Sequence, residues 1–260
     1  MRVAVLAASA VILAGSLEAK IVTKSVDYDA GGTACKGFVA YDDAKSGMRP
    51  GVLVVPEWWG LNEYPKKRAE QLAGLGYAAF AVAMYGGGKT TTDPKVAGAW
   101  ASEVKGNRKL MNERSSAGLA AFLKEGKEIV DPAKIAEIGY CFGGTTVLEA
   151  ARSGAAVKGI VSFHGSIPDP ATPGTVKARV LILTGAEDKS APADKVKAFE
   201  DEFKKAGGDC KTVSYPGAVH GFTNPDNGSD KSRGVAYDKD ADEKSWAAMK
   251  LFFDEIFAGK

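Results

Sequence analysis

The residue whose surroundings point most directly to chemistry is Cys141. It lies in a Gly-x-Cys-x-Gly sequence at residues 139–143, between a short apolar run at 135–138 and a stretch with helical periodicity. This order predicts a buried strand, a sharp turn and a helix, with the cysteine at the turn. The start of a helix favours the thiolate, so the pattern indicates a nucleophile. A buried packing cysteine or a phosphate-binding turn would also fit a glycine-rich segment.

A thiol nucleophile generally needs a histidine base, and the chain has two histidines, His164 and His220. His220 follows the last predicted strand, and Asp188 follows the strand before it. Both are therefore expected at the same edge of the sheet as Cys141. We predict His220 as the base that takes the thiol proton and Asp188 as the group that orients it, with Glu187 as a rival acid.

Other residues at strand ends supply a candidate binding site. Backbone N–H groups of Trp58 and Phe142 are expected to form an oxyanion hole. Aromatic side chains near these ends favour an apolar pocket, and polar ones could bind part of a ligand. The candidate substrate-binding residues are Trp59, Tyr85, Lys89, His164, Phe222 and Asn224. His164 could instead form hydrogen bonds at the end of its strand.

Apolar strands that alternate with amphipathic helices must bring these residues together. Strands are predicted at 51–55, 77–84, 135–138, 157–163, 178–184 and 211–215. Helices are predicted at 64–75, after the turn at Cys141, at 194–206 and at 245–257. Another helical stretch runs from 93 to about 104, breaks at Gly106-Asn107 and resumes to 123. Two runs at 21–28 and 33–41 around Gly31-Gly32 predict an edge β-hairpin. The sequence therefore predicts a single α/β domain over 20–260 with a doubly wound, mostly parallel sheet, in which the order nucleophile, acid, histidine is that of the α/β-hydrolase fold.

Composition and charge are those of an ordinary globular protein. The chain has 260 residues, 45% hydrophobic and 25% charged, with a formal net charge of +2. Such a balance does not favour nucleic acid as a partner, and a small ester or lactone fits the site better. A monomer is expected, and no metal or other cofactor is predicted.

The N-terminus has the composition of an export signal. Arg2 is followed by an apolar run to Leu13 and then by small residues up to Ala19. This predicts a signal peptide at 1–19, cleaved after Ala19, and a secreted or periplasmic protein with no membrane attachment after cleavage.

The chain has three cysteines, and no pair of them has the spacing of a zinc or redox motif. In an exported protein an odd count permits one disulfide and one free thiol. Cys35 and Cys210 would form that disulfide and leave Cys141 free, although the sequence does not establish that the two lie close together.

Four segments together resemble the dienelactone hydrolase (carboxymethylenebutenolidase) family. They are Gly139-Tyr140-Cys141-Phe142-Gly143-Gly144, Glu57-Trp58-Trp59-Gly60, Gly185-Ala186-Glu187-Asp188 and His220-Gly221-Phe222. The resemblance implies an α/β-hydrolase fold and hydrolysis of an enol-lactone by a Cys–His–Asp triad. It also implies that Glu57 bonds to the resting thiol and assists its deprotonation when substrate arrives.

The chain departs from the family at the two arginines that hold the carboxylate of a dienelactone. The matching positions are Gly87 and Asn224, and Lys89 could supply a charge nearby. A lysine is a point charge and does not replace a bidentate guanidinium. An esterase or thioesterase with another apolar acyl substrate is therefore an alternative. A non-catalytic thiol sensor or binding protein on the same fold is a second one.

Overall fold

The computed structural model describes residues 20–171 and 174–258. The signal peptide predicted at 1–19 lies outside the described residues. Within the described part of the chain, no helix combines the length and the apolar composition needed to cross a membrane.

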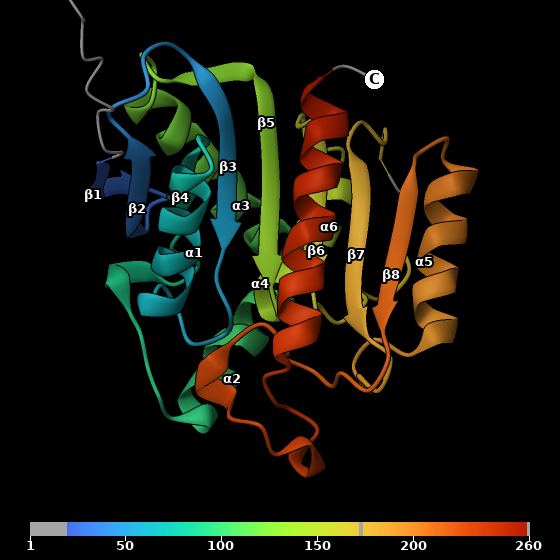
Figure 1. Cartoon of the computed structure of the whole chain (residues 1–260). Coiled ribbons are helices and arrows are strands. Elements are labelled where there is room, and N and C mark those ends of the chain that lie inside the picture. Colours follow the sequence, from blue (N-terminus) through green and yellow to red (C-terminus); the bar gives the residue numbers. More distant parts are fainter. Residues whose placement is uncertain (1–19, 172–173, 259–260) are drawn as a thin grey trace, which may run out of the picture.

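One eight-stranded sheet forms the centre of the molecule (Figure 1). Its strands are β1 (Ile21–Asp29), β2 (Ala34–Asp42), β3 (Arg49–Val55), β4 (Ala78–Ala81), β5 (Val130–Tyr140), β6 (Gly159–Phe163), β7 (Arg179–Gly185) and β8 (Cys210–Tyr215). In space they follow the order β1-β2-β4-β3-β5-β6-β7-β8. Every pair from β4 to β8 in this order is parallel, whereas β2 is antiparallel to β1 and β4. The carboxyl ends of the parallel strands therefore meet at one edge.

The N-terminal hairpin and the mostly parallel sheet were both predicted, and both are confirmed. β1 and β2 pair over their whole length, from Ile21 opposite Asp42 to Asp29 opposite Ala34. The turn between them contains Gly31 and Gly32, both with positive φ, which glycine adopts without steric cost. The hairpin closes one edge of the sheet.

Helices cover both faces of the sheet (Figure 1). They are α1 (Glu63–Gly74), α2 (Pro94–Lys105), α3 (Arg108–Glu125), α4 (Phe142–Arg152), α5 (Ala193–Lys205) and α6 (Lys239–Phe257), with short 3-10 turns η1 (Gly86–Gly88), η2 (Pro225–Asn227) and η3 (Lys231–Arg233). One buried cluster packs α1 and α6 against the sheet, with Leu72 and Phe253 among its members. The other packs α2 to α5 against the opposite face, with Phe122, Leu148 and Phe199. This two-sided burial explains the continuous apolar runs of the central strands.

Two predicted boundaries were wrong by five residues or more. α6 begins at Lys239, six residues before the predicted start, because the Asp238 side chain accepts a hydrogen bond from the backbone N–H of Ala241 and caps the helix. The first turn of α6 consists mostly of charged residues, so the apolar spacing that indicates a helix begins only later in the sequence. β5 begins at Val130 rather than at 135, since its first residues pair with β3 across an irregularity in register between Pro50 and Gly51.

The disulfide considered for Cys35 and Cys210 is excluded, because all three cysteines are free. Cys35 lies in β2 and Cys210 in β8, near opposite edges of the sheet. Neighbouring strands are about 4.8 Å apart, so the two residues are separated by roughly 25–30 Å. A disulfide requires Cα atoms within about 7 Å of one another.

Candidate active site

Cys141 lies at a strained turn between β5 and α4. Its backbone has φ 53° and ψ −113°, a conformation that non-glycine residues rarely adopt. A Cβ added at Gly139 would collide with the backbone of Gly143, and one at Gly143 would collide with the carbonyl of Val55. The glycines of the motif are therefore required by the close packing of the turn against the end of β3. The turn presents the sulfur at the carboxyl edge of the sheet, directly before the first residue of α4.

The side chains of Cys141, His220 and Asp188 form a continuous hydrogen-bonded chain. His220 Nε2 lies 3.1 Å from Cys141 Sγ. On the other side of the ring, Nδ1 donates to Asp188 Oδ2 at 2.8 Å. The side chain of Asp188 is 1% exposed and that of His220 is 17% exposed, so only the sulfur-facing end of the chain is open to a ligand. The three residues come from the ends of β5, β7 and β8, as the chain order predicted.

Ser190 also contacts this chain, a role that no motif in the sequence indicates. Its hydroxyl donates to Asp188 Oδ1 at 2.7 Å and lies 3.0 Å from His220 Nδ1. Its backbone N–H donates to the same carboxylate oxygen at 2.8 Å. Asp188 is therefore held from two sides. The neighbouring acid Glu187 is exposed and has no hydrogen bond with His220 among the described residues.

The local charges favour a protonated imidazole next to the sulfur. Burial opposes the charge, but the Cys141 sulfur and the Asp188 carboxylate outweigh it and raise the pKa of His220 well above its ordinary value. Burial likewise opposes ionisation of Asp188, yet hydrogen bonds from His220 and Ser190 lower the pKa of Asp188. The imidazole of His220 therefore keeps its proton to a higher pH than a free histidine does.

Glu57 lies just beyond the end of β3 and is 4% exposed. Burial raises its pKa to about 7, and the Asn224 hydrogen bond and the charge of His220 limit that rise. Asn224 Nδ2 donates to Glu57 Oε2 at 2.7 Å. No hydrogen bond joins Glu57 to Cys141 in the described part of the chain, although both residues line the same cavity.

A cavity of about 530 Å³ opens at Cys141. Its lining is mainly apolar and aromatic, with a few polar groups. The residues that line it are Glu57, Trp58, Trp59, Thr92, Pro94, Cys141, His220, Gly221, Asn227, Arg233 and Val235. Of the residues predicted from the sequence to bind substrate, Trp59 therefore lines the cavity.

The other predicted substrate-binding residues lie elsewhere. Tyr85 is 6% exposed and its hydroxyl donates to the Trp58 carbonyl at 3.1 Å, so it supports the cavity wall from behind. Phe222 is fully buried and packs edge-on against the His164 ring. Lys89 is exposed, and its ammonium lies 5.9 Å from the Trp100 ring. Asn224 bonds to Glu57 instead of facing the cavity.

His164 occupies the end of its strand, one of the two positions considered for it. It is fully buried behind the turn at Cys141 and does not line the cavity. Its Nδ1 accepts a hydrogen bond from the Cys141 backbone N–H at 3.1 Å.

Sequence reasoning missed Arg233, the one arginine or lysine among the described residues that line the cavity. It lies in η3, in an irregular segment after His220 that carries no periodic signal. The family's arginine positions, Gly87 and Asn224, do not line the cavity. Arg233 therefore brings a guanidinium to this cavity from a different part of the chain.

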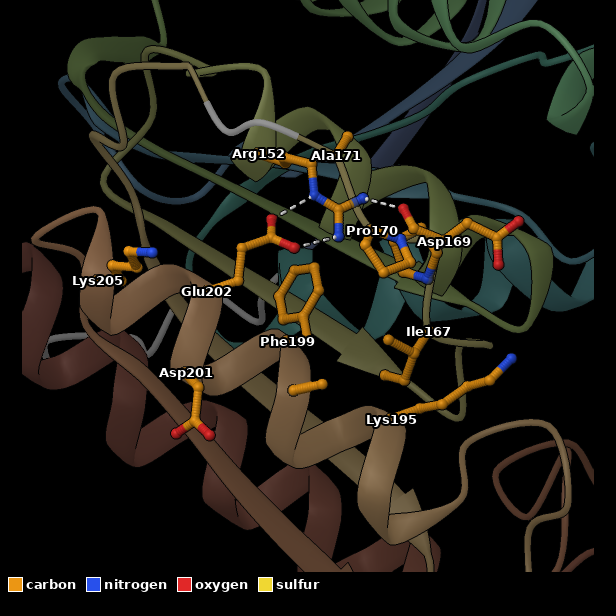
Figure 2. A pocket seen from close by; sticks show the side chains of 12 residues that line it. Arg152, Ile167, Asp169, Pro170, Ala171, Lys195, Phe199, Asp201, Glu202 and Lys205 are labelled. Atoms are coloured by element: carbon orange, nitrogen blue, oxygen red, sulfur yellow. Dashed lines mark hydrogen bonds and ion pairs between the residues drawn. The ribbon is translucent and has the colours of Figure 1, made fainter.

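A second hollow of about 520 Å³ shares no lining residue with the cavity at Cys141. Figure 2 shows Arg152 at its wall, bonded to the Glu202 carboxylate and to the Asp169 carbonyl. Phe199 lies below the guanidinium, 5.0 Å from its carbon. These partners satisfy Arg152 within the protein, and none of the described residues that line the hollow is a cysteine, serine or histidine.

Comparison with known proteins agrees with this geometry. The model of the dienelactone hydrolase family matches residues 36–257. A Synechocystis sp. protein named "Putative carboxymethylenebutenolidase" is 29% identical over 224 residues, covering 80% of this chain and 86% of its own. The crystal structure of a dienelactone hydrolase-like promiscuous phosphotriesterase from metagenomic libraries is 39% identical, with a TM-score of 0.85, and covers 91% of this chain and 98% of its own. With its α/β-hydrolase sheet and a family match over most of its length, the chain belongs to the dienelactone hydrolase family.

Proposed function

We propose that this protein hydrolyses small esters or lactones through an acyl-enzyme formed on Cys141. The observation that carries the proposal is the hydrogen-bonded chain from Asp188 through His220 to the Cys141 sulfur, open to a cavity at the carboxyl edge of the sheet. Membership of a hydrolase family supports the same reaction.

In the proposed reaction the sulfur attacks the carbonyl carbon of the substrate while His220 holds the thiol proton. A tetrahedral intermediate forms and collapses, the C–O bond breaks, and His220 gives the proton to the leaving alkoxide. A water molecule then attacks the thioester, with His220 as the base, and releases the acid and the free thiol. Asp188 keeps the Nδ1–H of His220 pointing away from the sulfur and stabilises the imidazolium.

The oxyanion hole proposed for this reaction uses the backbone N–H groups of Trp58 and Phe142. Phe142 is the first residue of α4, where N–H groups lack an intrahelical acceptor. Neither N–H donates to a protein acceptor within the described residues. Both are therefore available for an oxyanion, and loss of one such donor typically costs about 10²–10³-fold in rate.

Glu57 is proposed as a second proton-holding group beside the sulfur. Its pKa of about 7 means that it can carry or release a proton near neutral pH. The family resemblance assigns this glutamate a bond to the resting thiol. Here its carboxylate accepts a hydrogen bond from Asn224, and it lines the same cavity as Cys141.

The lining of the cavity supports a compact acyl group with an apolar part. Trp58, Trp59, Pro94 and Val235 supply apolar surface, and Arg233 supplies a positive charge. Thioesters fit the same chemistry, because a sulfur leaving group is displaced by the same attack.

The test is turnover of p-nitrophenyl esters, an enol-lactone and an acyl thioester by the mature protein and by Cys141→Ala. Wild type should hydrolyse at least one class, and the variant should lose about 10³-fold or more of kcat/KM with its folding intact. A wild type that folds but turns over none of them would favour a thiol sensor or binding protein instead.

Phosphotriesters are a second candidate substrate class. The similarity to the dienelactone hydrolase-like phosphotriesterase, 39% identical over 91% of this chain, favours including them. The uncharged aromatic wall of Trp58 and Trp59 suits a neutral aryl phosphotriester. Release of p-nitrophenol from such a compound, compared between wild type and Cys141→Ala, tests this class directly.

The proposed location of the activity is outside the cytoplasm, because residues 1–19 have the composition of an export signal. N-terminal sequencing of protein recovered from the periplasm or medium of the native host would test this, with Lys20 as the expected first residue.

A further inference from the structure

His164 lies directly behind the nucleophile and takes no part in the chain from Asp188 to Cys141. It is the first residue after β6, it is fully buried, and it has a positive φ of 40°. The Cys141 backbone N–H has two acceptors, His164 Nδ1 at 3.1 Å and the Phe163 carbonyl at 3.0 Å. A buried residue in such a backbone conformation persists only where its surroundings fix it. For His164, one of these surrounding contacts is the backbone N–H of Cys141, whose own backbone is strained.

The second nitrogen of the ring fixes its tautomer. His164 Nε2 lies 2.7 Å from the Thr223 hydroxyl. Because Nδ1 must accept from a backbone N–H, the proton of the neutral ring is on Nε2 and is donated to Thr223. Burial, and after it the charge of His220, lower the pKa of His164 well below its ordinary value, so Nδ1 keeps its lone pair.

A buried polar chain extends from Thr223 to two helices on one face of the sheet. Thr223 Oγ1 lies 2.6 Å from the Tyr64 hydroxyl, which accepts from Arg68 Nε at 3.2 Å. Arg68 also donates to the Thr223 carbonyl at 2.7 Å and to Asp242 Oδ1 at 2.6 Å. Tyr64 and Arg68 belong to α1, and Asp242 belongs to α6. Every member has a partner, which a buried network requires to be stabilising.

Hydrogen bonds of this network connect the segment that carries His220 to Cys141. Thr223 follows His220 by three residues and holds the His164 ring, and Asn224 holds Glu57. The two imidazole rings are 5.4 Å apart, yet both nitrogens of His164 are occupied, so it cannot take the proton of Cys141.

We propose that His164 is a positioning residue, which holds the backbone N–H of Cys141 through Nδ1 while Thr223 fixes its tautomer, so that the sulfur stays aligned with His220 Nε2. The inference rests on the proposed function only for its turnover readout. The effect of His164 on the reactivity of the Cys141 thiol can be measured by alkylation, without any substrate.

The test compares two substitutions, one that keeps an acceptor facing Cys141 and one that removes it. His164→Asn keeps an acceptor near the position of Nδ1, and asparagine tolerates positive φ. His164→Phe keeps the ring and removes the acceptor. Both lose the bond to Thr223. The measurements are kcat and KM for a p-nitrophenyl ester, and the rate of alkylation of Cys141 by iodoacetamide, followed by mass spectrometry of its peptide.

We expect His164→Phe to lower both kcat and the alkylation rate by roughly 3- to 30-fold with KM changed less than about twofold, and His164→Asn to recover most of both. Phe203→Leu, a core substitution in α5, serves as a control for lost stability, and its kcat should not change. Equal rates for the two His164 variants, or losses that only track melting temperature as in the control, would overturn the proposal.

A further variant and the comparison of the two readouts cover the remaining outcomes. If His164→Phe does not fold, Thr223→Val removes the hydroxyl at constant shape and should lower the alkylation rate by about threefold; an unchanged rate would count against the proposal. If wild type turns over no ester while alkylation still depends on His164, the proposed function fails and the positioning role stands. If wild type turns over an ester while alkylation is independent of His164, the proposed function stands and the positioning role fails.

Discussion

Replacing Glu57 with glutamine should make the folded protein more stable at alkaline pH. The carboxyl is buried at the end of β3 and has one hydrogen bond, from Asn224. Burial raises its pKa from 4.5 to about 7, which means that the folded state binds the proton more tightly than the unfolded state does. Ionising Glu57 therefore costs folding free energy, and this cost is present above pH 7 and disappears as the pH falls towards 4.5.

The magnitude follows from the same shift. Each pH unit between the two pKa values corresponds to roughly 1.4 kcal/mol, so a rise from 4.5 to about 7 amounts to about 3 kcal/mol at pH 8. A glutamine at this position would not ionise, and its amide oxygen could still accept from Asn224 Nδ2. We expect Glu57→Gln to be more stable than wild type by about 2–3 kcal/mol at pH 8, and by less than about 1 kcal/mol at pH 5.

Glu137 offers a matched control. It lies in β5, it is 2% exposed, and burial alone raises its pKa to about 7 as well. Its Oε2 has no hydrogen-bond partner among the described residues, and it does not line the cavity. Glu137→Gln should therefore stabilise the protein with the same pH dependence and leave turnover unchanged, whereas Glu57→Gln should also lower turnover.

The assay is urea denaturation of wild type and both variants at pH 5 and pH 8, with ester turnover measured at pH 8. A Glu57→Gln protein that is less stable than wild type by the same amount at both pH values would refute the reasoning, because the ionised carboxylate would then be stabilising. Equal turnover in wild type and Glu57→Gln would remove Glu57 from the proposed proton transfer.

Three other outcomes follow from the site. Ser190→Ala removes a donor from Asp188 and should lower kcat by about 3- to 10-fold, with the acid limb of the pH–rate profile moved to higher pH; an unchanged profile would assign Ser190 no role. Because the pKa of His220 is raised well above its ordinary value, alkylation of Cys141 by iodoacetamide should show no inflection near pH 6.5, and a midpoint there would contradict the raised pKa of His220. Arg233→Gln should raise KM several-fold for an ester with a free carboxylate and leave a neutral ester unaffected, and an equal change for both would show that the guanidinium acts on shape only.

Sequence patterns were sufficient to predict that Cys141, Asp188 and His220 lie close together. Cys141, Asp188 and His220 each follow a buried apolar run, and in a parallel sheet such runs end at one edge. Their chain order and glycine pattern then predicted that they meet, and their side chains do form one hydrogen-bonded chain.

The direction of a side chain at the same edge could not be predicted. Tyr85 and Phe222 follow strands as Trp59 does, but they turn inward to pack, because an aromatic ring at a strand end buries more apolar surface in the core than in an open cavity. Arg233 was missed because it does not follow a predicted strand. It reaches the cavity from a segment without periodicity, whose path depends on turns and side-chain contacts spread over the chain.

His164 and Thr223 show a third kind of gap. His164 was a candidate pocket residue and Thr223 was not singled out, and only the folded structure reveals that they bond to each other. Such a contact joins residues 59 positions apart and depends on the path of two loops. Polar pairs of this kind carry no periodic signal, so pattern reasoning does not reach them.

The most direct test of a nucleophilic Cys141 is to trap the acyl group it should carry. Wild type mixed with excess p-nitrophenyl acetate and quenched with acid within the first turnover should release a burst of about one equivalent of p-nitrophenol and carry one acetyl group on the Cys141 peptide by mass spectrometry. His220→Ala should lose the burst. An acetyl group on another residue, or full turnover retained by Cys141→Ala, would contradict a nucleophilic Cys141.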